Sequence, residues 1–284
     1  MPPRWLAAGM ALCFAAAPAP PGGPVADATP SGFREIAPGC ARWDFTGPWR
    51  KVMQDVTVVR ADLDIPGVSA EVECRRETTI EGYHRDRTER AAKEDIRLVA
   101  TLNGSVLGAV AAGRVVSCPK EEGPEICWGM DGRGAFIRPI DFFRSAIGKE
   151  ASEGIRGALC PWPPGCPPVV EDGTGVDEAV LDEGVRVARV RNPRSLAGIG
   201  AKGRRVYLVL IRGRSQQSVG MTLDEAGAFL CEQLPEIESA VNLDGGASSS
   251  LFVAGEDIRR MACVRNLRKI PSVIHILAPG GEKK

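Results

Sequence analysis

A strand, a capped helix and a second strand follow one another in the second half of this chain. Arg205–Ile211 is an almost continuous apolar run, which indicates a strand covered on both faces. Thr222 and Glu225 form a capping-box pattern before Leu223–Leu234, where apolar residues recur at helical spacing. Ser239–Leu243 has the composition of a strand. The pattern predicts a β–α–β crossover within a mixed sheet.

The rest of the chain alternates short apolar runs with turn signals. It predicts strands at 56–63, 96–102, 134–140 and 272–277, and a short helix at 141–147. A chain of 284 residues is long enough to bury a large core. We therefore expect an α+β fold with a mixed β-sheet core and packed helices, in a single domain over residues 33–280.

The charge balance excludes one class of partner. The chain has 36 basic and 36 acidic residues, whereas nucleic-acid-binding domains concentrate basic residues on one surface. The run His84–Arg90 alternates in sign, which is typical of a solvated helix face or loop. We expect no nucleic-acid partner.

The N-terminus resembles an export signal. Arg4 precedes the apolar stretch Trp5–Ala17, and small residues offer cleavage sites near Ala17 or Ala28. Residues 1–26 are interpreted as a signal peptide with the start of a linker, and 27–32 as the rest of that Pro/Gly-rich linker. The apolar stretch is shorter than the roughly 20 residues of a membrane span. We therefore expect a secreted or periplasmic protein without a membrane span.

Cysteine usage supports export. The chain has nine cysteines, and removal of Cys13 with the signal leaves eight, an even number. The spacings suggest the pairs Cys118–Cys127, Cys160–Cys166, Cys40–Cys74 and Cys231–Cys263, although many other connectivities exist. Zinc is the competing explanation, but the sequence has no C-x-x-C and only two histidines. The domain is therefore expected to be stabilised by disulfides.

The segment Ala240–Leu251 is the main candidate for chemistry. An apolar run ends at Asp244, and Gly245 and Gly246 then lead into serines that include Ser248 and Ser249. Glycines permit unusual dihedrals and close approach of a ligand to the backbone, and hydroxyls and amides can hold an anion. An ordinary strand-to-turn connection has the same pattern.

Two other catalytic patterns are weak. Gly198–Gly203 fits G-x-G-x-x-G, but a strand-like run leaves it where a dinucleotide site requires a helix, so a hairpin turn is predicted. His275 falls within a predicted strand and His84 within the charged run, and G-x-S-x-G is absent. Any acid–base chemistry is therefore expected from carboxylates.

Polar residues at strand ends are further candidates. Arg194 precedes an apolar run, and Arg212 and Arg214 flank Gly213 just after one. A guanidinium can bind two phosphate oxygens at once. Asn103 follows a predicted strand, where Asn-Gly also suits a simple hairpin turn.

Taken in order, five segments resemble motifs of the phosphodiester glycosidase family, from about Val99 to Pro279. They are Ala100–Gly104 (similar to A-I-N-x-G), Pro168–Gly173, Asn192–Gly200 (similar to R-T-A-I-G), Val219–Leu223 (similar to G-M-T-L) and Asn242–Ser249 (similar to N-L-D-G-G-G-S-S). The resemblance implies a secreted or lumenal α+β catalytic domain that cleaves the bond between a sugar anomeric carbon and a phosphodiester, such as one of N-acetylglucosamine. The expected partner is a sugar-phosphodiester or polysaccharide substrate.

The resemblance also implies roles for individual residues. Asp244, Asn103 and Arg194 are the predicted catalytic group. The predicted substrate-binding group is Asn242, Gly245, Gly246, Ser248, Ser249, Arg212, Gly213 and Gly220. A second carboxylate is open among Asp172, Asp224 and Glu225. No cofactor is expected, although Asp244 with Asn103 or Asn242 could offer oxygen ligands to calcium.

Two departures from the family pattern bear on activity. Ser105–Leu107 replaces the aromatic residues that usually follow the asparagine turn, and Ala247 replaces the third glycine of the main motif. A positive φ at that position would strain an alanine. The alternative function is therefore a carbohydrate- or phosphate-binding module of the cell envelope that has lost turnover, and a third is a structural secreted protein.

Overall fold

A computed structural model describes residues 32–105, 109–117, 123–151, 154–162, 166–177, 187–255 and 268–280. The predicted signal peptide and most of the linker lie outside these residues, as do Cys13, Cys118 and Cys263. In the described part, neither α-helix has the length and apolarity that a membrane crossing requires. Residues 32–284 form one compact unit.

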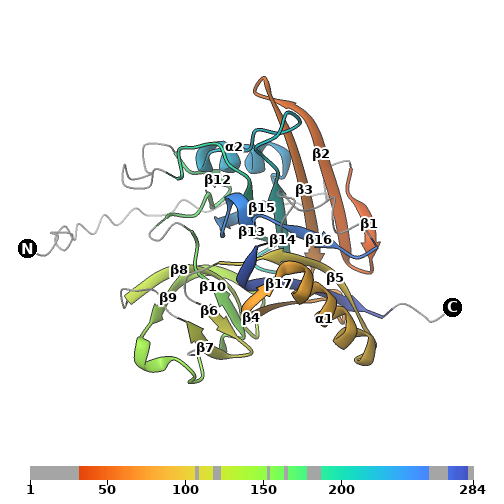
Figure 1. Ribbon diagram of the computed structural model, residues 1–284, viewed down its shortest axis with the longest axis vertical. Coiled ribbons are helices and arrows are strands. Elements are labelled where there is room, and N and C mark those ends of the chain that lie inside the picture. The colour runs from red at the N-terminus through yellow and green to blue at the C-terminus, as the bar shows by residue number, and fades with distance from the viewer. Residues whose placement is uncertain are drawn as a thin grey trace, which may run out of the picture. The chain divides into compact units, whose positions relative to one another are not determined.

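The described residues of this unit form three antiparallel sheets (Figure 1). The eight-stranded sheet has the order β1-β2-β3-β14-β13-β15-β11-β12, with β1 Arg34–Ala37, β2 Cys40–Trp49, β3 Val52–Asp62, β14 Arg205–Ile211, β13 Arg194–Gly200, β15 Ile237–Asn242, β11 Val170–Glu171 and β12 Thr174–Gly175. The five-stranded sheet is β7-β6-β10-β8-β9, with β7 Arg114–Ser117, β6 Ala109–Ala111, β10 Gly157–Leu159, β8 Gly123–Met130 and β9 Ala135–Phe142. The four-stranded sheet is β16-β5-β17-β4, with β16 Leu251–Val253, β5 Ile96–Asn103, β17 Lys269–Pro279 and β4 Ser69–Thr79.

The predicted α+β class, a mixed sheet with packed helices, is wrong. The chain is mainly β, and the described residues contain two α-helices, α1 Ile80–Lys93 and α2 Leu223–Gln233. The crossover β14–α2–β15 exists, but β13 is inserted between the two strands and pairs antiparallel with both. Strands β14 and β15 therefore run in the same direction without being neighbours, and every strand pairing among the described residues is antiparallel.

Strand β14 explains the long apolar run. Leu208 and Leu210 belong to the core that this sheet shares with the other two sheets. Tyr207 and Val209 point to the opposite face, where they pack in a second core with Phe229 of α2. Both faces are thus buried, because alternate residues of a strand point to opposite sides.

Both helices begin at capping residues. The predicted capping box of Thr222 and Glu225 is confirmed at α2. Thr79 caps α1, whose Ile80 and Tyr83 pack in a cluster with Phe252 and other residues of the four-stranded sheet. This helix contains the charged run that the sequence left open between helix and loop.

Two other expectations can be compared with the structure. Gly198–Gly203 is confirmed as part of a hairpin, since β13 passes through a turn into β14. The predicted helix at 141–147 is wrong, because Asp141 and Phe142 belong to β9 and only Arg144–Ala146 forms a 3-10 turn.

The predicted disulfide framework is also wrong. The described cysteines, namely Cys40, Cys74, Cys127, Cys160, Cys166 and Cys231, are all free thiols. Cys127 was expected to pair with Cys118, but its Sγ lies 3.2 Å from the Sγ of Cys160, since β8 and β10 are adjacent strands. Sequence spacing alone could not reveal this neighbour.

Candidate active site beside the Asp-Gly-Gly turn

The Asp-Gly-Gly motif connects two sheets. Strand β15 of the eight-stranded sheet ends at Asn242, and β16 of the four-stranded sheet begins at Leu251. Between them Gly246 opens a 3-10 turn with a φ of 63°, in the left-handed region that favours glycine. Ala247 is not among the described residues with positive φ. The replacement of the third glycine therefore introduces no backbone strain of the kind considered from the sequence.

Asp244 is half-buried at the start of this turn. Its backbone N–H donates to the Gly104 carbonyl at 3.1 Å. Burial raises the pKa of its carboxyl group, although hydrogen bonds from Ser248 and the Gly245 N–H and the charge of Arg268 oppose this. The carboxyl group is therefore only partly compensated by its surroundings, which is a common property of groups that transfer protons.

The Asn103 side chain holds the turn in place through hydrogen bonds. Its side chain is fully buried, and its Nδ2 donates to the Asp244 carbonyl at 2.7 Å. Its Oδ1 accepts from Ser195 Oγ at 2.5 Å and from the Ser250 N–H at 2.8 Å. Two of these bonds join β5 to the β15–β16 connection and one joins it to β13, so Asn103 positions Asp244, and its buried side chain does not face a cleft. Its Oδ1 is already used by two donors.

A cavity of about 240 Å³ adjoins the turn. Its lining residues are Trp162, Val187, Asn192, Arg194, Arg214, Gly245, Gly246, Ala247 and Arg268. Three of them are arginines and none carries a carboxylate. Asp244 directly precedes the three motif residues in this lining. Such an arrangement can hold an anion beside an acid.

Arg194 is part of the wall of this cavity. Its side chain is 1% exposed, and Nε donates to the Met221 carbonyl at 2.9 Å. Its Nη2 donates to the carbonyls of Val187 and Val190 at 2.9 and 2.7 Å. Burial lowers its pKa to about 10, which still leaves the guanidinium charged at neutral pH. Arg194 therefore supplies charge and also holds the surrounding loop together.

Arg214 reaches the cavity from the segment after β14. It is a non-glycine residue with a φ of 58°, a costly conformation that often occurs at functional sites. Its Nη2 donates to Asn192 Oδ1 at 2.8 Å, and Nε to the same oxygen at 3.3 Å. A Cβ added at Gly246 would stand 3.3 Å from Nη2. Asn192 thus orients the guanidinium over the turn.

The structure separates Arg212, Gly213 and Gly220 from the cavity lining. Arg212 Nη1 bonds to Asp55 on β3, at 2.5 Å. Gly213 and Gly220 allow close backbone packing: an added Cβ at Gly220 would lie 2.4 Å from the carbonyl of Asn192. They hold the Asn192 segment in place, which is an indirect contribution to the site.

Two buried polar atoms near the turn have no partner within the described chain. Asn242 Nδ2 donates to the Trp162 and Leu243 carbonyls, which leaves its buried Oδ1 without a donor. The Ser249 hydroxyl is likewise buried and unpaired. Buried polar groups normally have partners. These two atoms therefore could accept or donate to a ligand or a water molecule.

The motif amides are largely occupied. The Gly246 N–H donates to the Pro193 carbonyl at 2.9 Å and the Ser248 N–H to the Gly245 carbonyl at 3.3 Å. The Gly245 N–H faces the Asp244 carboxylate. The expected cradle of free amides is thus used within the turn, and the arginines are the prominent donors at the cavity.

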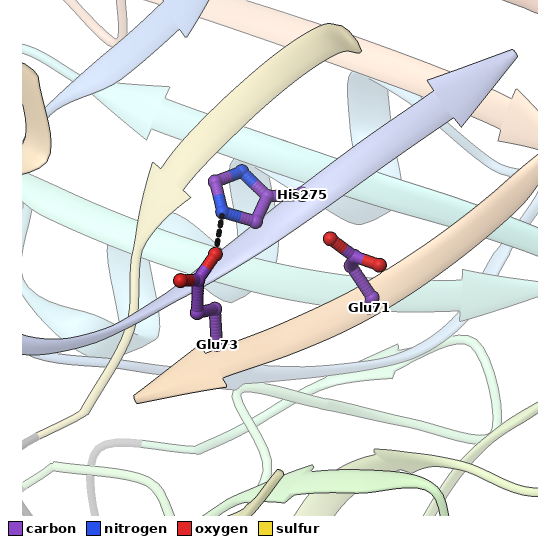
Figure 2. Close-up of side chains that lie close together, drawn as sticks. All are labelled: Glu71, Glu73 and His275. Atoms are coloured by element: carbon purple, nitrogen blue, oxygen red, sulfur yellow. Dashed lines mark hydrogen bonds and ion pairs between the residues drawn. The ribbon is translucent and has the colours of Figure 1, made fainter. Parts of the chain in front are cut away.

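A second polar cluster lies on the four-stranded sheet. Figure 2 shows Glu71 and Glu73 of β4 beside His275 of β17, with His275 Nε2 at 3.2 Å from Glu73. The ligand atoms of these residues lie within 4.8 Å of one another, as in some metal sites. His275 sits opposite Glu71 in the strand register. The sequence did not indicate this grouping, because it depends on strand pairing.

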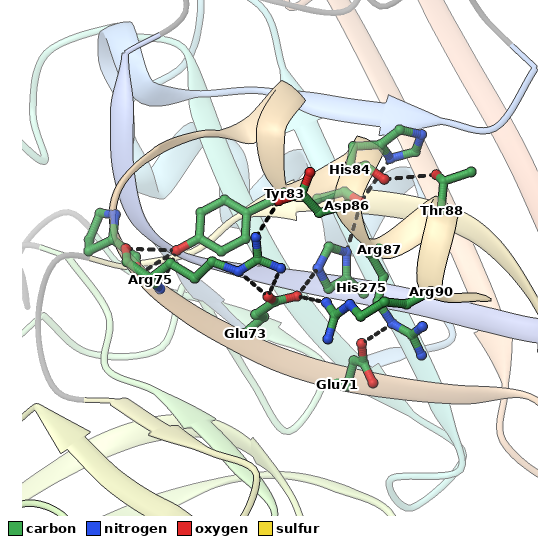
Figure 3. A network of polar contacts seen from close by, with 12 residues as sticks. Glu71, Glu73, Arg75, Tyr83, His84, Asp86, Arg87, Thr88, Arg90 and His275 are labelled. Carbon is green, nitrogen blue, oxygen red and sulfur yellow. Dashed lines mark hydrogen bonds and ion pairs between the residues drawn. The ribbon is translucent and has the colours of Figure 1, made fainter. Parts of the chain in front are cut away.

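Arginines already neutralise the carboxylates of this cluster (Figure 3). Arg87 donates to Glu71, while Arg75 and Arg90 both donate to Glu73. A cation would have to displace these guanidinium groups. We therefore interpret the cluster as an ion-pair network that connects α1 to the sheet.

A hydrogen-bonded chain extends the network into the core. The Thr101 hydroxyl lies 2.9 Å from Nδ1 of both His84 and His275. Because His275 Nε2–H faces Glu73, its Nδ1 accepts from Thr101, which in turn accepts from His84. Burial lowers the pKa of His84 to about 4 and also lowers the pKa of His275. Both histidines are therefore neutral at pH 7, as expected of satisfied core residues.

Comparison with known proteins identifies the family. The sequence profile of the phosphodiester glycosidases matches residues 99–277, which span β5 to β17 and include the whole Asp-Gly-Gly turn. The chain belongs to the phosphodiester glycosidase family. No curated protein sequence matches the chain.

Solved structures show that the chain shares its fold with distant proteins. A hypothetical protein from Synechocystis has a TM-score of 0.58 at 14% identity; the match covers 89% of this chain and 64% of that protein. The zebrafish N-acetylglucosamine-1-phosphodiester α-N-acetylglucosaminidase catalytic domain, auto-inhibited by its pro-peptide, has a TM-score of 0.58 at 16% identity. That match covers 86% of this chain and 85% of the zebrafish domain. A putative exported protein from Burkholderia pseudomallei has a TM-score of 0.55 at 15% identity, and the match covers 81% of this chain and 75% of that protein.

The structure thus brings part of the predicted site together. Arg194, Gly245 and Gly246 line the cavity beside Asp244, and Asn103 and Asn242 hold the turn and the Trp162 loop. The candidates for a second carboxylate lie elsewhere, in an exposed turn for Asp172 and at the start of α2 for Asp224 and Glu225.

Sequence reasoning missed Trp162, Asn192 and Arg268 as cavity residues, and noted Arg214 without selecting it. The available signal was weak: Asn192 and Arg214 lie near segments that resemble family motifs, but only the fold shows that their side chains meet.

Proposed function

We propose that this phosphodiester glycosidase hydrolyses a sugar-1-phosphodiester, with N-acetylglucosamine as the sugar by analogy to the zebrafish enzyme. The observation that carries the proposal is the arginine-lined cavity next to Asp244. It supplies a place for the phosphate and an acid beside it, which are the two requirements of this reaction.

The phosphate is held by the arginines of the cavity. Arg194 forms the buried wall, Arg214 is oriented over the turn by Asn192, and Arg268 is an exposed residue of the lining. Each guanidinium can donate to phosphate oxygens, and their charge stabilises the negative charge that grows on the leaving phosphate. Trp162 offers an apolar surface beside them for the sugar or the group esterified to the phosphate.

Asp244 acts at the sugar carbon. Water adds to the anomeric carbon while the bond from that carbon to the phosphate oxygen breaks. The hydroxyl remains on the sugar, and the second proton of the water passes through Asp244 to the solvent or the phosphate monoester. Because a phosphate leaves as a stabilised anion, the reaction requires less help from a second, protonated carboxylic acid than other glycoside hydrolysis does.

The site of action is proposed to lie outside the cytoplasm. The predicted signal peptide and the likeness to the putative exported protein from Burkholderia pseudomallei support this proposal. An N-terminal sequence of the mature protein, recovered from the periplasm or medium, tests it.

The experiment for the function is hydrolysis of a chromogenic or UDP-linked α-N-acetylglucosamine phosphodiester by the purified mature protein. We expect saturable turnover that Asp244→Asn lowers about 10³-fold without changing the melting temperature by more than a few degrees. Asp64→Asn, an exposed carboxylate paired with Arg204, is the matched control. Equal rates in the wild type and Asp244→Asn would contradict the assignment.

A second candidate is a binding module without turnover. The occupied motif amides and the lack of a carboxylate among the described cavity residues favour it. Saturable binding of the phosphodiester with no hydrolysis in any condition would select this candidate.

A further inference from the structure

We infer that the arginine-lined cavity binds a phosphate monoester more tightly than a phosphodiester, so that the phosphate-bearing product of the reaction competes with the substrate. This inference rests on the proposed function and concerns the charge of the ligand that the cavity prefers. Inorganic phosphate carries the same chemistry and is expected to bind in the same place.

The first argument is the charge of the cavity. Its described lining has three guanidinium groups and no carboxylate. Asp244 interacts with Arg268 and Asp224 interacts with Arg194, so two carboxyl groups offset part of the charge, and the three guanidinium groups keep a net positive charge. A diester brings one negative charge, whereas a monoester brings close to two at pH 7. Attraction to several fixed cations grows with ligand charge, so the monoester gains more from the same cavity.

The second argument is the way Arg214 is held. Its backbone is in the left-handed region, and Asn192 Oδ1 accepts from both Nε and Nη2. Within the described chain these bonds leave Nη1 without a partner. A side chain fixed in this way loses little further freedom on binding an anion, because the guanidinium is already oriented. Gly246 leaves the room that this position requires.

The third argument is the number of oxygens. A cavity of about 240 Å³ accommodates one phosphate group. A monoester presents three terminal oxygens, and a diester presents two. Arg194, Arg214 and Arg268 come from different segments of the chain. The third terminal oxygen of the monoester product can therefore accept a hydrogen bond from an arginine, and the diester substrate has no equivalent terminal oxygen.

The three arginines differ in what they can reveal by mutation. Arg194 is buried and holds four backbone carbonyls of its surroundings, so its replacement would disturb folding. Arg214 is exposed and bonded to one side chain, which makes it the better probe. Asn192→Leu retains all three charges; it removes the oxygen that orients Arg214 and also the Nδ2 group that donates to the Val190 carbonyl at 3.4 Å. Arg204→Gln removes an exposed arginine that pairs with Asp64, away from the cavity, and is the control.

The test is a binding titration of the mature protein with methyl phosphate, dimethyl phosphate and inorganic phosphate at constant ionic strength. At about pH 8 we expect methyl phosphate and inorganic phosphate to bind at least tenfold more tightly than dimethyl phosphate. The ratio should fall towards one near pH 5, where the monoester loses its second charge. Dimethyl phosphate keeps one charge throughout, so it reports the titration of Asp244 and other protein groups separately.

The variants complete the test. Arg214→Gln is expected to weaken methyl phosphate binding at least tenfold, Asn192→Leu by a smaller factor, and Arg204→Gln by less than twofold, with thermal melts confirming folding. Equal affinity for monoester and diester, or no binding of either, overturns the inference. If the protein prefers the monoester but shows no turnover, the inference is supported and the proposed function fails. If the protein turns over the substrate but binds monoester and diester equally, the proposed function is supported and the inference fails.

Discussion

The cavity beside Asp244 and the network around Glu73 are both built from arginines and carboxyl groups, but their charges are balanced differently. In the network, Arg75 and Arg90 share Glu73, and Arg87 bonds to Glu71. The described lining of the cavity has three arginines and no carboxylate. Charge that is matched by neighbours serves the fold, whereas unmatched charge is available to a ligand.

The same contrast applies to the groups that titrate. Burial raises the pKa of Asp244, so its carboxyl group is only partly compensated. Burial alone would also raise the pKa of Glu73, but the hydrogen bond from His275 and the interactions with Arg90 and Arg75 outweigh it and lower the pKa to about 2. A cluster of ionisable residues is therefore a better candidate for function when its compensation is incomplete.

The largest expected effect compares two buried arginines, one from each region. Arg194→Met should lower turnover at least about 100-fold and the free energy of unfolding by about 3 kcal/mol, since it removes phosphate charge and leaves buried carbonyls unpaired. Arg87→Met should lower the free energy of unfolding by about 1 kcal/mol, because Glu71 and Glu94 remain accessible to water, and it should leave turnover unchanged. Steady-state kinetics and urea unfolding measure both. A similar loss of turnover in the two variants would remove the distinction.

Glu73→Gln should lower the free energy of unfolding by about 3 kcal/mol at neutral pH, because it separates Glu73 from its arginines. Its folded-state pKa of about 2 is below the ordinary value of 4.5, so its contribution is complete above pH 4.5 and declines as the pH falls towards 2. Urea titrations at several pH values should thus show the deficit shrinking in acid. A deficit that is constant with pH would contradict the ion-pair interpretation.

His84→Gln should reduce the acid sensitivity of the fold. The folded-state pKa of about 4 lies below the ordinary 6.5, so the unfolded chain takes up the proton first and stability is lost as the pH falls from 6.5 to 4. In the described part of the chain, His84 contacts Thr101 and the Phe252 ring, and the charge of nearby His275 lowers its pKa further. Between pH 7 and pH 4, we expect the free energy of unfolding to fall by about 2 kcal/mol less in the variant than in the wild type, as measured by urea unfolding at each pH. Identical losses would show that His84 is not buried in its neutral form.

Ala247→Gly should have the smallest effect. Because Ala247 does not occupy the left-handed region, glycine relieves no strain there. Glycine makes the unfolded chain more flexible, so the free energy of unfolding should fall by about 0.5 kcal/mol. Thermal or urea unfolding provides the value. A gain of stability would indicate that the alanine is strained after all.

Local features were well predicted from the sequence. The capping box of Thr222 and Glu225, the doubly covered strand Arg205–Ile211 and the hairpin at Gly198–Gly203 are all present. Each depends on neighbouring residues, and the spacing of those residues is visible in one dimension. The family motifs could be recognised for the same reason, because they are short continuous segments.

The fold class could not be predicted in this way. Strand β13 lies between β14 and β15 in space but precedes both in sequence, so the correct β–α–β order suggested a mixed sheet. The wrong disulfide pairs have the same origin: Cys127 and Cys160 meet because β8 and β10 are adjacent. Long-range pairing depends on how strands assemble, and sequence separation contains little information about it.

By itself, the sequence determined the local elements, the family and the acid at the turn, since these depend on residues that are close together in the chain. The tertiary structure decided which charges remain available. It paired Arg212 with Asp55, used Asn103 to fasten the turn and brought Arg214 and Arg268 to the cavity with Arg194. The physical reason is that the electrostatic environment of a side chain is set by neighbours in space, and most of these come from distant parts of the sequence.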